Sequence, residues 1–81
     1  MKILVTGAAG FIGSNLCGAL LSQGHTVCGI DNLSQSSLRN LKPYLSHSQF
    51  KFVEEDVRSF EAMKKMSQGA SVLVHLAAFK I

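Results

Sequence analysis

The sequence contains 81 residues, which is enough for at most one small domain with a limited hydrophobic core. Hydrophobic residues make up 47% and charged residues 16%, which indicates a globular chain rather than a disordered one. The net charge is +3, but the basic residues are scattered rather than clustered, so we expect no nucleic-acid partner.

The first predicted element is an apolar strand, residues 2–6, which runs into three glycines at three-residue spacing, Gly7, Gly10 and Gly13. Strand, glycine turn and helix together are typical of a turn that binds the pyrophosphate of a dinucleotide. Gly7 suits the tight turn, Gly10 lets backbone N–H groups approach a ligand, and Gly13 lets the helix lie close to the strand. The helix N-terminus would then face the anion with unpaired N–H groups. A glycine-rich turn that binds nothing is the alternative.

The helix after this turn is predicted from the spacing of Ile12, Leu16 and Leu20, which lie four residues apart. With Ala19 beside them, these residues would form the apolar face of the helix. Gly24 is in a position to end it.

A second apolar strand, residues 26–30, ends at Asp31, which follows Gly7 by 24 positions. This is close to the spacing of about 20 residues between such a glycine turn and the acid that binds the adenosine ribose. A carboxylate there accepts hydrogen bonds from the ribose hydroxyls and repels a 2′-phosphate. No arginine adjoins Asp31, whose neighbour is Asn32, so we expect NAD rather than NADP. A helix-capping or turn carboxylate is the alternative.

The next elements are a short helix over residues 38–45, limited in regularity by Pro43, and a third strand over residues 50–53. Asp56 follows this strand, where its side chain could reach the adenine amino group; an ordinary acid at a strand end is the alternative. A third helix begins after Ser59, and a fourth strand covers residues 71–76.

The order β-α-β-α-β-α-β, with right-handed crossovers, predicts an α/β fold of the Rossmann type. We expect four parallel strands in the order 3-2-1-4, with the first two helices on one face and the third on the other. The strand ends that carry Gly7, Asp31, Asp56 and Ala77 would share one edge of the sheet. Ligands bind at this edge in such folds.

Cys17 and Cys28 fall in a predicted helix and a predicted strand, without the spacing of a redox pair or a metal site. We therefore expect buried thiols, no metal and a reducing, cytoplasmic location. No apolar run approaches the roughly 20 residues of a membrane span, and Thr6 and Gly7 interrupt the apolar start too early for a signal peptide. We expect no membrane partner.

Four motifs together carry a family resemblance: Thr6-Gly-Ala-Ala-Gly-Phe-Ile-Gly13, Asp31-Asn-Leu33, Asp56-Val57 and His75-Leu-Ala-Ala78. They resemble the extended short-chain dehydrogenase/reductases over the whole chain. Within these, the sequence is most similar to the NAD-dependent epimerase/dehydratase family that acts on nucleotide sugars, with UDP-glucose 4-epimerase the nearest type.

The resemblance implies three groups of cofactor-binding residues. Around the pyrophosphate it places the glycine turn and the start of the helix: Gly7, Gly10, Phe11, Ile12 and Gly13. Around the adenosine it places residues that follow the second and third strands: Asp31, Asn32, Ser36, Asp56 and Val57. Along the dinucleotide channel it places residues that follow the fourth strand: Leu76, Ala77, Ala78 and Lys80.

Enzymes of this family use a Tyr-x-x-x-Lys pair for catalysis, which this chain lacks: its one tyrosine is Tyr44, and Ser48 stands where the lysine would be. We therefore expect residues 1–81 to be an incomplete N-terminal NAD-binding half with no catalytic residue. The nucleotide sugar would bind only in the full-length parent. A bare sheet edge near Val72 and Val74 would favour self-association.

Three alternatives remain. The chain could be a non-catalytic NAD(P)-sensing module of the same fold, or a truncated product without activity. A methyltransferase-like domain also places an acid after its second strand, but its usual G-x-G-x-G spacing differs from the glycine spacing here.

Overall fold

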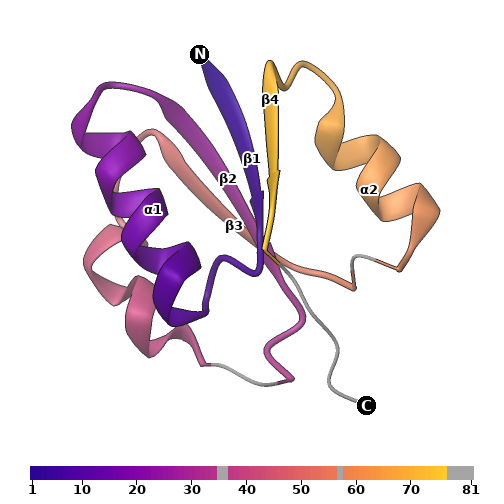
Figure 1. Cartoon of the computed structure of the whole chain (residues 1–81), viewed down its shortest axis with the longest axis horizontal. Coiled ribbons are helices and arrows are strands. Elements are labelled where there is room, and N and C mark those ends of the chain that lie inside the picture. The colour runs from indigo at the N-terminus through magenta and orange to yellow at the C-terminus, as the bar shows by residue number, and fades with distance from the viewer. Residues whose placement is uncertain (35–36, 57, 77–81) are drawn as a thin grey trace.

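The computed structural model describes residues 1–34, 37–56 and 58–76. Seven elements follow one another along the chain: β1 (Lys2–Thr6), α1 (Phe11–Ser22), β2 (Thr26–Asp31), the 3-10 helix η1 (Leu38–Tyr44), β3 (Phe50–Glu54), α2 (Phe60–Ser67) and β4 (Val72–His75). The strands form one parallel sheet in the order β3-β2-β1-β4 (Figure 1). The predicted Rossmann-type topology is confirmed.

The helices cover both faces of this sheet, as right-handed crossovers require. Helix α1 and η1 lie together on one face, and α2 lies on the other, beside β4 (Figure 1). In the register of the two central strands, Leu4 pairs with Cys28 and Thr6 with Ile30. The carboxyl ends of β1 and β2 are therefore neighbours, and the glycine turn lies next to Asp31.

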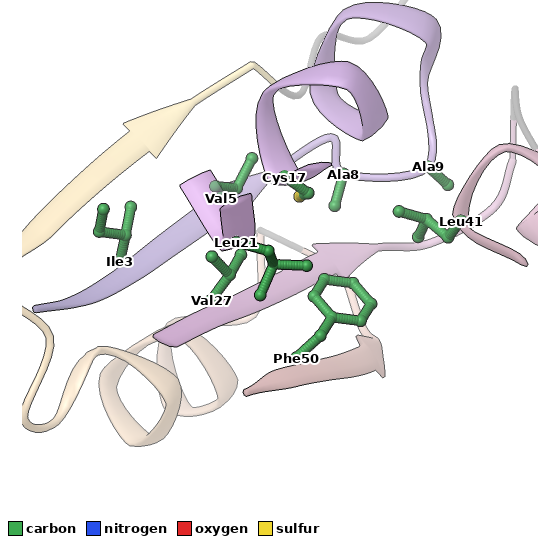
Figure 2. Close-up of a cluster of buried hydrophobic side chains, with 9 residues drawn as sticks. All are labelled: Ile3, Val5, Ala8, Ala9, Cys17, Leu21, Val27, Leu41 and Phe50. Atoms are coloured by element: carbon green, nitrogen blue, oxygen red, sulfur yellow. The ribbon is translucent and has the colours of Figure 1, made fainter. Parts of the chain in front are cut away.

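The larger hydrophobic cluster fills the space between the sheet and the α1 face. Side chains from the strands, the glycine turn, α1 and η1 meet there (Figure 2). They are Ile3, Val5, Ala8, Ala9, Cys17, Leu21, Val27, Leu41 and Phe50. Because two of these residues belong to the glycine turn, the turn is part of the core rather than a loop lying over it.

The opposite face has a smaller cluster made of Leu4, Cys28 and Ile30. Met63 and Met66 of α2 pack against it while partly buried. The methionines of this helix thus serve as packing residues, as flexible side chains on an irregular surface often do.

The predicted apolar face of α1 is wrong in its rotation about the helix axis. Ile12 has 70% of its surface exposed, and Ala19 is exposed as well. Leu16 and Leu20 are only half-buried and pack at the border of the larger cluster. The spacing of four residues is correct, but this line of residues is not the innermost one.

The innermost line of α1 is Gly13, Cys17 and Leu21. Gly13 sets this rotation, because a Cβ at this position would overlap the carbonyl oxygen of Gly7. Only the side of the helix without a side chain can therefore meet the end of β1. The close approach predicted for Gly13 is confirmed, and it decides which residues of α1 are buried.

The segment η1 forms a 3-10 helix that contains Pro43, in agreement with its predicted irregularity. The Ser37 hydroxyl accepts a hydrogen bond from the Arg39 N–H at its start, at 3.3 Å. Leu41 is fully buried, and Tyr44 packs over Gly18 of α1, where a Cβ would overlap the phenol ring. These contacts fix η1 against α1.

Both cysteines are buried and free, as predicted, and they lie in the clusters on opposite faces of the sheet. Burial, and to a smaller extent the charge of Cys28, raises the pKa of the Cys17 thiol to about 11. Burial also raises the pKa of Cys28, although the nearby ammonium groups of Lys2 and Lys51 oppose this. The thiols are therefore protonated at neutral pH and behave as small apolar side chains.

Within residues 1–34, 37–56 and 58–76, no three histidine, cysteine or acidic side chains gather where they could hold a metal ion. No helix in this part of the chain is long and apolar enough to cross a lipid bilayer.

Candidate functional site

The glycine turn links β1 to α1 through a compact backbone. Gly7 has φ +70°, a conformation that glycine adopts without the strain that a Cβ would cause. The Gly10 N–H donates to the Gly7 carbonyl at 3.2 Å, and the Ala8 N–H donates to the Ile30 carbonyl at 3.2 Å. The turn is therefore closed on itself and joined to the end of β2.

The N-terminus of α1 opens from this turn. Gly10 is the capping position in an extended conformation, and it offers no side chain to bond the first turn. The first helical bond runs from the Ser14 N–H to the Gly10 carbonyl at 2.9 Å. The N–H groups of Phe11, Ile12 and Gly13 follow this carbonyl by fewer than four residues, so the helix itself cannot pair them. The first turn contains no acidic residue, and the side chains of Phe11 and Ile12 are exposed. This is an open, partly positive site for an anion.

Asp31 lies at the end of β2, directly against the glycine turn. Its Oδ2 accepts a hydrogen bond from the Ala9 N–H at 3.0 Å, and its Oδ1 accepts one from the Leu33 N–H at 2.8 Å. An ionised carboxylate has about four acceptor positions, so these two bonds leave acceptor capacity on each oxygen. The structure thus brings the predicted ribose acid and the predicted pyrophosphate turn together.

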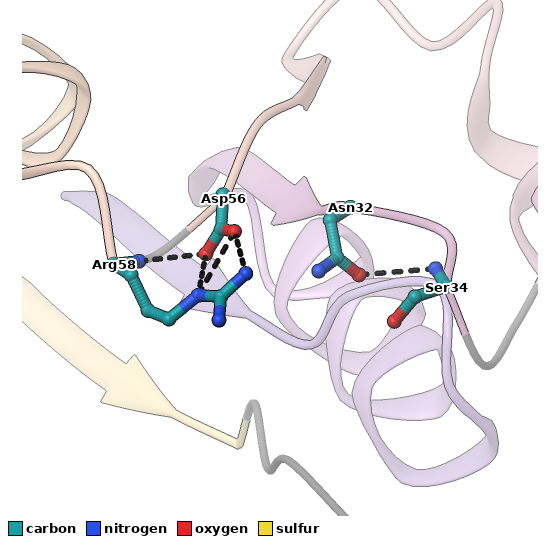
Figure 3. Close-up of polar contacts among 4 residues, drawn as sticks. All are labelled: Asn32, Ser34, Asp56 and Arg58. Carbon is teal, nitrogen blue, oxygen red and sulfur yellow. Dashed lines mark hydrogen bonds and ion pairs between the residues drawn. The ribbon is translucent and has the colours of Figure 1, made fainter.

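The chain after Asp31 turns sharply. Leu33 has φ +60°, which is uncommon for a residue with a side chain, and its N–H bond to Asp31 stabilises that conformation. The next turn is closed by the Ser34 N–H, which donates to Asn32 Oδ1 at 3.0 Å (Figure 3). Asn32 itself is half-buried.

Asp56, which was predicted near adenine, forms an ion pair with Arg58 (Figure 3). The guanidinium donates from Nη2 at 2.6 Å and from Nε at 3.0 Å to Oδ2, and the Arg58 N–H donates to Oδ1 at 2.8 Å. The Arg58 side-chain hydrogen bonds, followed by its backbone N–H, lower the pKa of the Asp56 carboxyl. The role of Asp56 at adenine stays a prediction, and Arg58 is a partner that sequence reasoning missed.

The end of β4 is joined to the end of β1 beside Gly7. The Leu76 N–H donates to the Thr6 Oγ1 at 3.0 Å, and His75 Nδ1 lies 2.8 Å from the same hydroxyl. Leu76 is thus placed beside the glycine turn with its side chain exposed, and the Thr6 hydroxyl is a polar partner of His75.

Several predicted residues lie outside the part of the chain that the structure describes: Ser36, Val57, Ala77, Ala78 and Lys80. Their roles remain predictions. Sequence reasoning also missed Asn40, whose Nδ2 donates to the Ala9 carbonyl at 3.0 Å. No spacing pattern connects these two residues, which are 31 positions apart.

A hollow of about 490 Å³ lies elsewhere in the molecule, between the sheet and the end of α2. Its lining residues are Lys2, Thr26, Val27, Cys28, Lys51, Lys65, Met66 and Gln68. None of them belongs to the glycine turn or to the strand ends that carry Asp31 and Asp56. This hollow is therefore separate from the candidate site.

Comparison with known proteins identifies the family. The model of the NAD dependent epimerase/dehydratase family matches residues 3–81. The chain belongs to this family. The resemblance carried by the four sequence motifs is thus confirmed. The glycine turn and Asp31 lie within the matched residues of a family described as NAD dependent.

Two curated relatives of this family member are similar over nearly its whole length. An uncharacterised UDP-glucose epimerase of Bacillus subtilis, YtcB, is 44% identical, with 96% of this chain and 26% of the relative covered. A UDP-glucose 4-epimerase of Mycolicibacterium smegmatis is 42% identical, with 96% of this chain and 25% of the relative covered. The chain therefore spans about a quarter of the length of these relatives.

Solved structures agree with this assignment. A dTDP-glucose 4,6-dehydratase from Bacillus anthracis, determined in complex with NAD, superposes with a TM-score of 0.92 at 32% identity, covering 98% of this chain and 27% of that one. A UDP-glucose 4-epimerase from Thermotoga maritima, determined with UDP-glucose, gives a TM-score of 0.84 at 36% identity, covering 96% of this chain and 24% of that one.

Proposed function

We propose that this family member binds NAD at the glycine turn and is the N-terminal dinucleotide-binding part of a nucleotide-sugar epimerase or dehydratase. The observation that carries the proposal is the hydrogen bond between the Ala9 N–H and Asp31 Oδ2. It puts a carboxylate suited to ribose hydroxyls beside a turn suited to a pyrophosphate, which is the combination that a dinucleotide requires.

The residues present fit the two charged and polar parts of NAD. The pyrophosphate would lie at the open N-terminus of α1, where the Phe11, Ile12 and Gly13 N–H groups have no partner within the helix. The ribose hydroxyls would donate to the remaining acceptor positions of Asp31. Bound NAD would supply the hydride acceptor of the reaction, while these residues of the chain hold it in place.

The same carboxylate favours NAD over NADP. A 2′-phosphate on the adenosine ribose would come close to Asp31, and two negative charges about 4 Å apart repel by about 4 kcal/mol at an effective dielectric constant near 20. The nearest arginine in sequence is Arg39, eight positions after Asp31, so no arginine directly adjoins the carboxylate to favour a phosphate.

For the whole enzyme we propose the UDP-glucose 4-epimerase type, in which bound NAD transiently oxidises the sugar. The two relatives whose names include UDP-glucose epimerase support this choice. The 81-residue chain contains no Tyr-x-x-x-Lys pair, so we expect it to bind the cofactor without turning over a sugar. Its two free cysteines suit a reducing compartment, and we propose a cytoplasmic location.

Calorimetric titration of the 81-residue chain with NAD and NADP tests the cofactor site. We expect saturable NAD binding that is at least tenfold tighter than NADP binding. Asp31→Asn should weaken NAD binding about tenfold or more, because the loss of a charged hydrogen bond costs roughly 1.5–3 kcal/mol. The same substitution should reduce the difference between the affinities for NAD and NADP.

Glu61→Gln is the matched control, because it neutralises one exposed carboxylate on α2 and should leave NAD binding unchanged. Equal NAD binding by the parent chain and Asp31→Asn, or no saturable binding at all, would refute the proposed site. Incubation with UDP-glucose and NAD is a separate test. Epimerisation by this chain alone would contradict the expectation that it binds the cofactor without turning over a sugar.

A further inference from the structure

In the glycine turn, both backbone polar groups of Ala9 form hydrogen bonds with side chains from other elements. The Ala9 N–H donates to Asp31 Oδ2 at 3.0 Å, and the Ala9 carbonyl accepts from Asn40 Nδ2 at 3.0 Å. Ala9 itself is fully buried. We propose that Asn40 is a positioning residue for the dinucleotide site, which fixes the peptide that leads into α1. The effect on the ligand rests on the function proposed above.

The geometry of the peptide explains how Asn40 acts at a distance from the ligand. The Ala9 carbonyl and the Gly10 N–H belong to one planar peptide group, so turning one turns the other. Asn40 bonds the carbonyl end, and the Gly7 carbonyl bonds the N–H end at 3.2 Å. Because Gly10 is the N-terminal cap of α1, this peptide sets the direction in which the first helical N–H groups point.

Asn40 can do this because its own backbone is firmly placed, although its side chain is at the surface. The next residue, Leu41, is fully buried in the same cluster as Ala9. Tyr44, one helical turn further on, packs against Gly18 of α1. The carboxamide thus reaches the turn from a support that is anchored to the core and to α1.

The chemistry requires a neutral hydrogen-bond donor at this position. The Ala9 carbonyl is an acceptor, so an aspartate at position 40 would present a carboxylate oxygen to it and repel it. Alanine would leave the carbonyl to water. Since Asn40 is exposed and removes little apolar surface from water, we expect both substitutions to alter the turn more than the stability of the fold.

Amide hydrogen exchange, measured by NMR on the ligand-free chain, tests the contact itself. Asn40→Ala should increase the exchange rates of the Ala9 and Gly10 amides about tenfold, which corresponds to one hydrogen bond of ordinary strength. Asn15→Ala, which removes an exposed asparagine from α1, is the control and should leave both rates unchanged. Asn40→Asp provides a second variant of nearly the same shape without the donor.

Ligand affinity tests the positioning role, because two ligands depend on different parts of the site. NAD has a pyrophosphate that meets the turn, whereas adenosine has only the ribose and the base. Asn40→Ala should weaken NAD binding about three- to thirtyfold and change adenosine binding, followed by NMR, by less than twofold. General damage to the fold would weaken both ligands together.

The outcomes separate this inference from the proposed function. Faster exchange in Asn40→Ala, together with a parent chain that does not bind NAD, would support the contact and refute the NAD site. Unchanged exchange at Ala9 and Gly10, or an equal loss of NAD and adenosine binding, would overturn the role of Asn40.

Discussion

The two faces of the sheet are buried to very different extents. On the α1 face, nine buried residues form one cluster that includes the glycine turn and η1. On the α2 face, the cluster of buried residues in the described part of the chain has three members, and Leu73 of β4, which pairs with Leu4 of that cluster, is 52% exposed. The turn, Asp31 and Asn40 all depend on the first face. The proposed cofactor site therefore lies on the well-packed half of the molecule, and β4 contributes an apolar edge.

The largest expected effect comes from filling the contact between α1 and the glycine turn. Gly13→Ala should destabilise the chain by about 2–4 kcal/mol, because the new Cβ would overlap the Gly7 carbonyl and force the helix away from β1. Thermal or urea unfolding followed by circular dichroism measures this loss.

Gly18→Ala in the same helix is the control for that substitution. Its Cβ would meet only the phenol end of Tyr44, which can move aside. The gain in helix propensity, about 1 kcal/mol, should offset most of that cost. Equal destabilisation by the two substitutions would show that the backbone contact at Gly13 has no special importance.

Truncating a leucine on each face compares the two halves directly. Leu41→Ala should cost about 2–4 kcal/mol, since it opens a cavity in the larger cluster, whereas Leu73→Ala should cost less than about 1 kcal/mol because the side chain is half exposed. Chemical unfolding of both variants tests this order. A larger loss of stability for Leu73→Ala would show that the α2 face is the better packed of the two.

The smallest effect is expected at the β4 edge, where the quantity measured is association between chains. We predict that the chain self-associates as its concentration rises, because Val72, Leu73 and Leu76 are exposed and the outer side of β4 pairs with no other described strand. Leu73→Lys should weaken this association, as a charge on an edge strand usually does. Sedimentation velocity over a range of concentrations measures it, and a parent chain that stays monomeric throughout would contradict the prediction.

The sequence was sufficient for those features that depend on spacing along the chain. Glycines at three-residue intervals predicted the turn, and the distance from Gly7 to Asp31 predicted an acid at the neighbouring strand end. Both are local consequences of a strand, a crossover and a strand in parallel order. The sheet order followed from the same rules and is confirmed.

Features that depend on contacts between elements could not be predicted in this way. Counting apolar positions gave Ile12 an inward position, but the contact between Gly13 and Gly7 determined the rotation of α1 and left Ile12 exposed. The hydrogen bond from Asn40 to Ala9 joins η1 to the glycine turn, two segments with no shared sequence pattern. The pairing of Asp56 with Arg58 could have been predicted from the sequence, since opposite charges two residues apart in a turn often form an ion pair.

The position of Tyr44 makes the docking of η1 observable without any label. It is the only tyrosine, and the chain contains no tryptophan, so the tyrosine fluorescence arises from a single ring and is not transferred to an indole. The ring of Tyr44 packs against Gly18 of α1. Tyr44 lies four residues after Asn40, the asparagine that donates a hydrogen bond to the glycine turn. Its emission intensity and anisotropy therefore follow the junction of η1 and α1 in real time, as the chain folds or takes up a nucleotide.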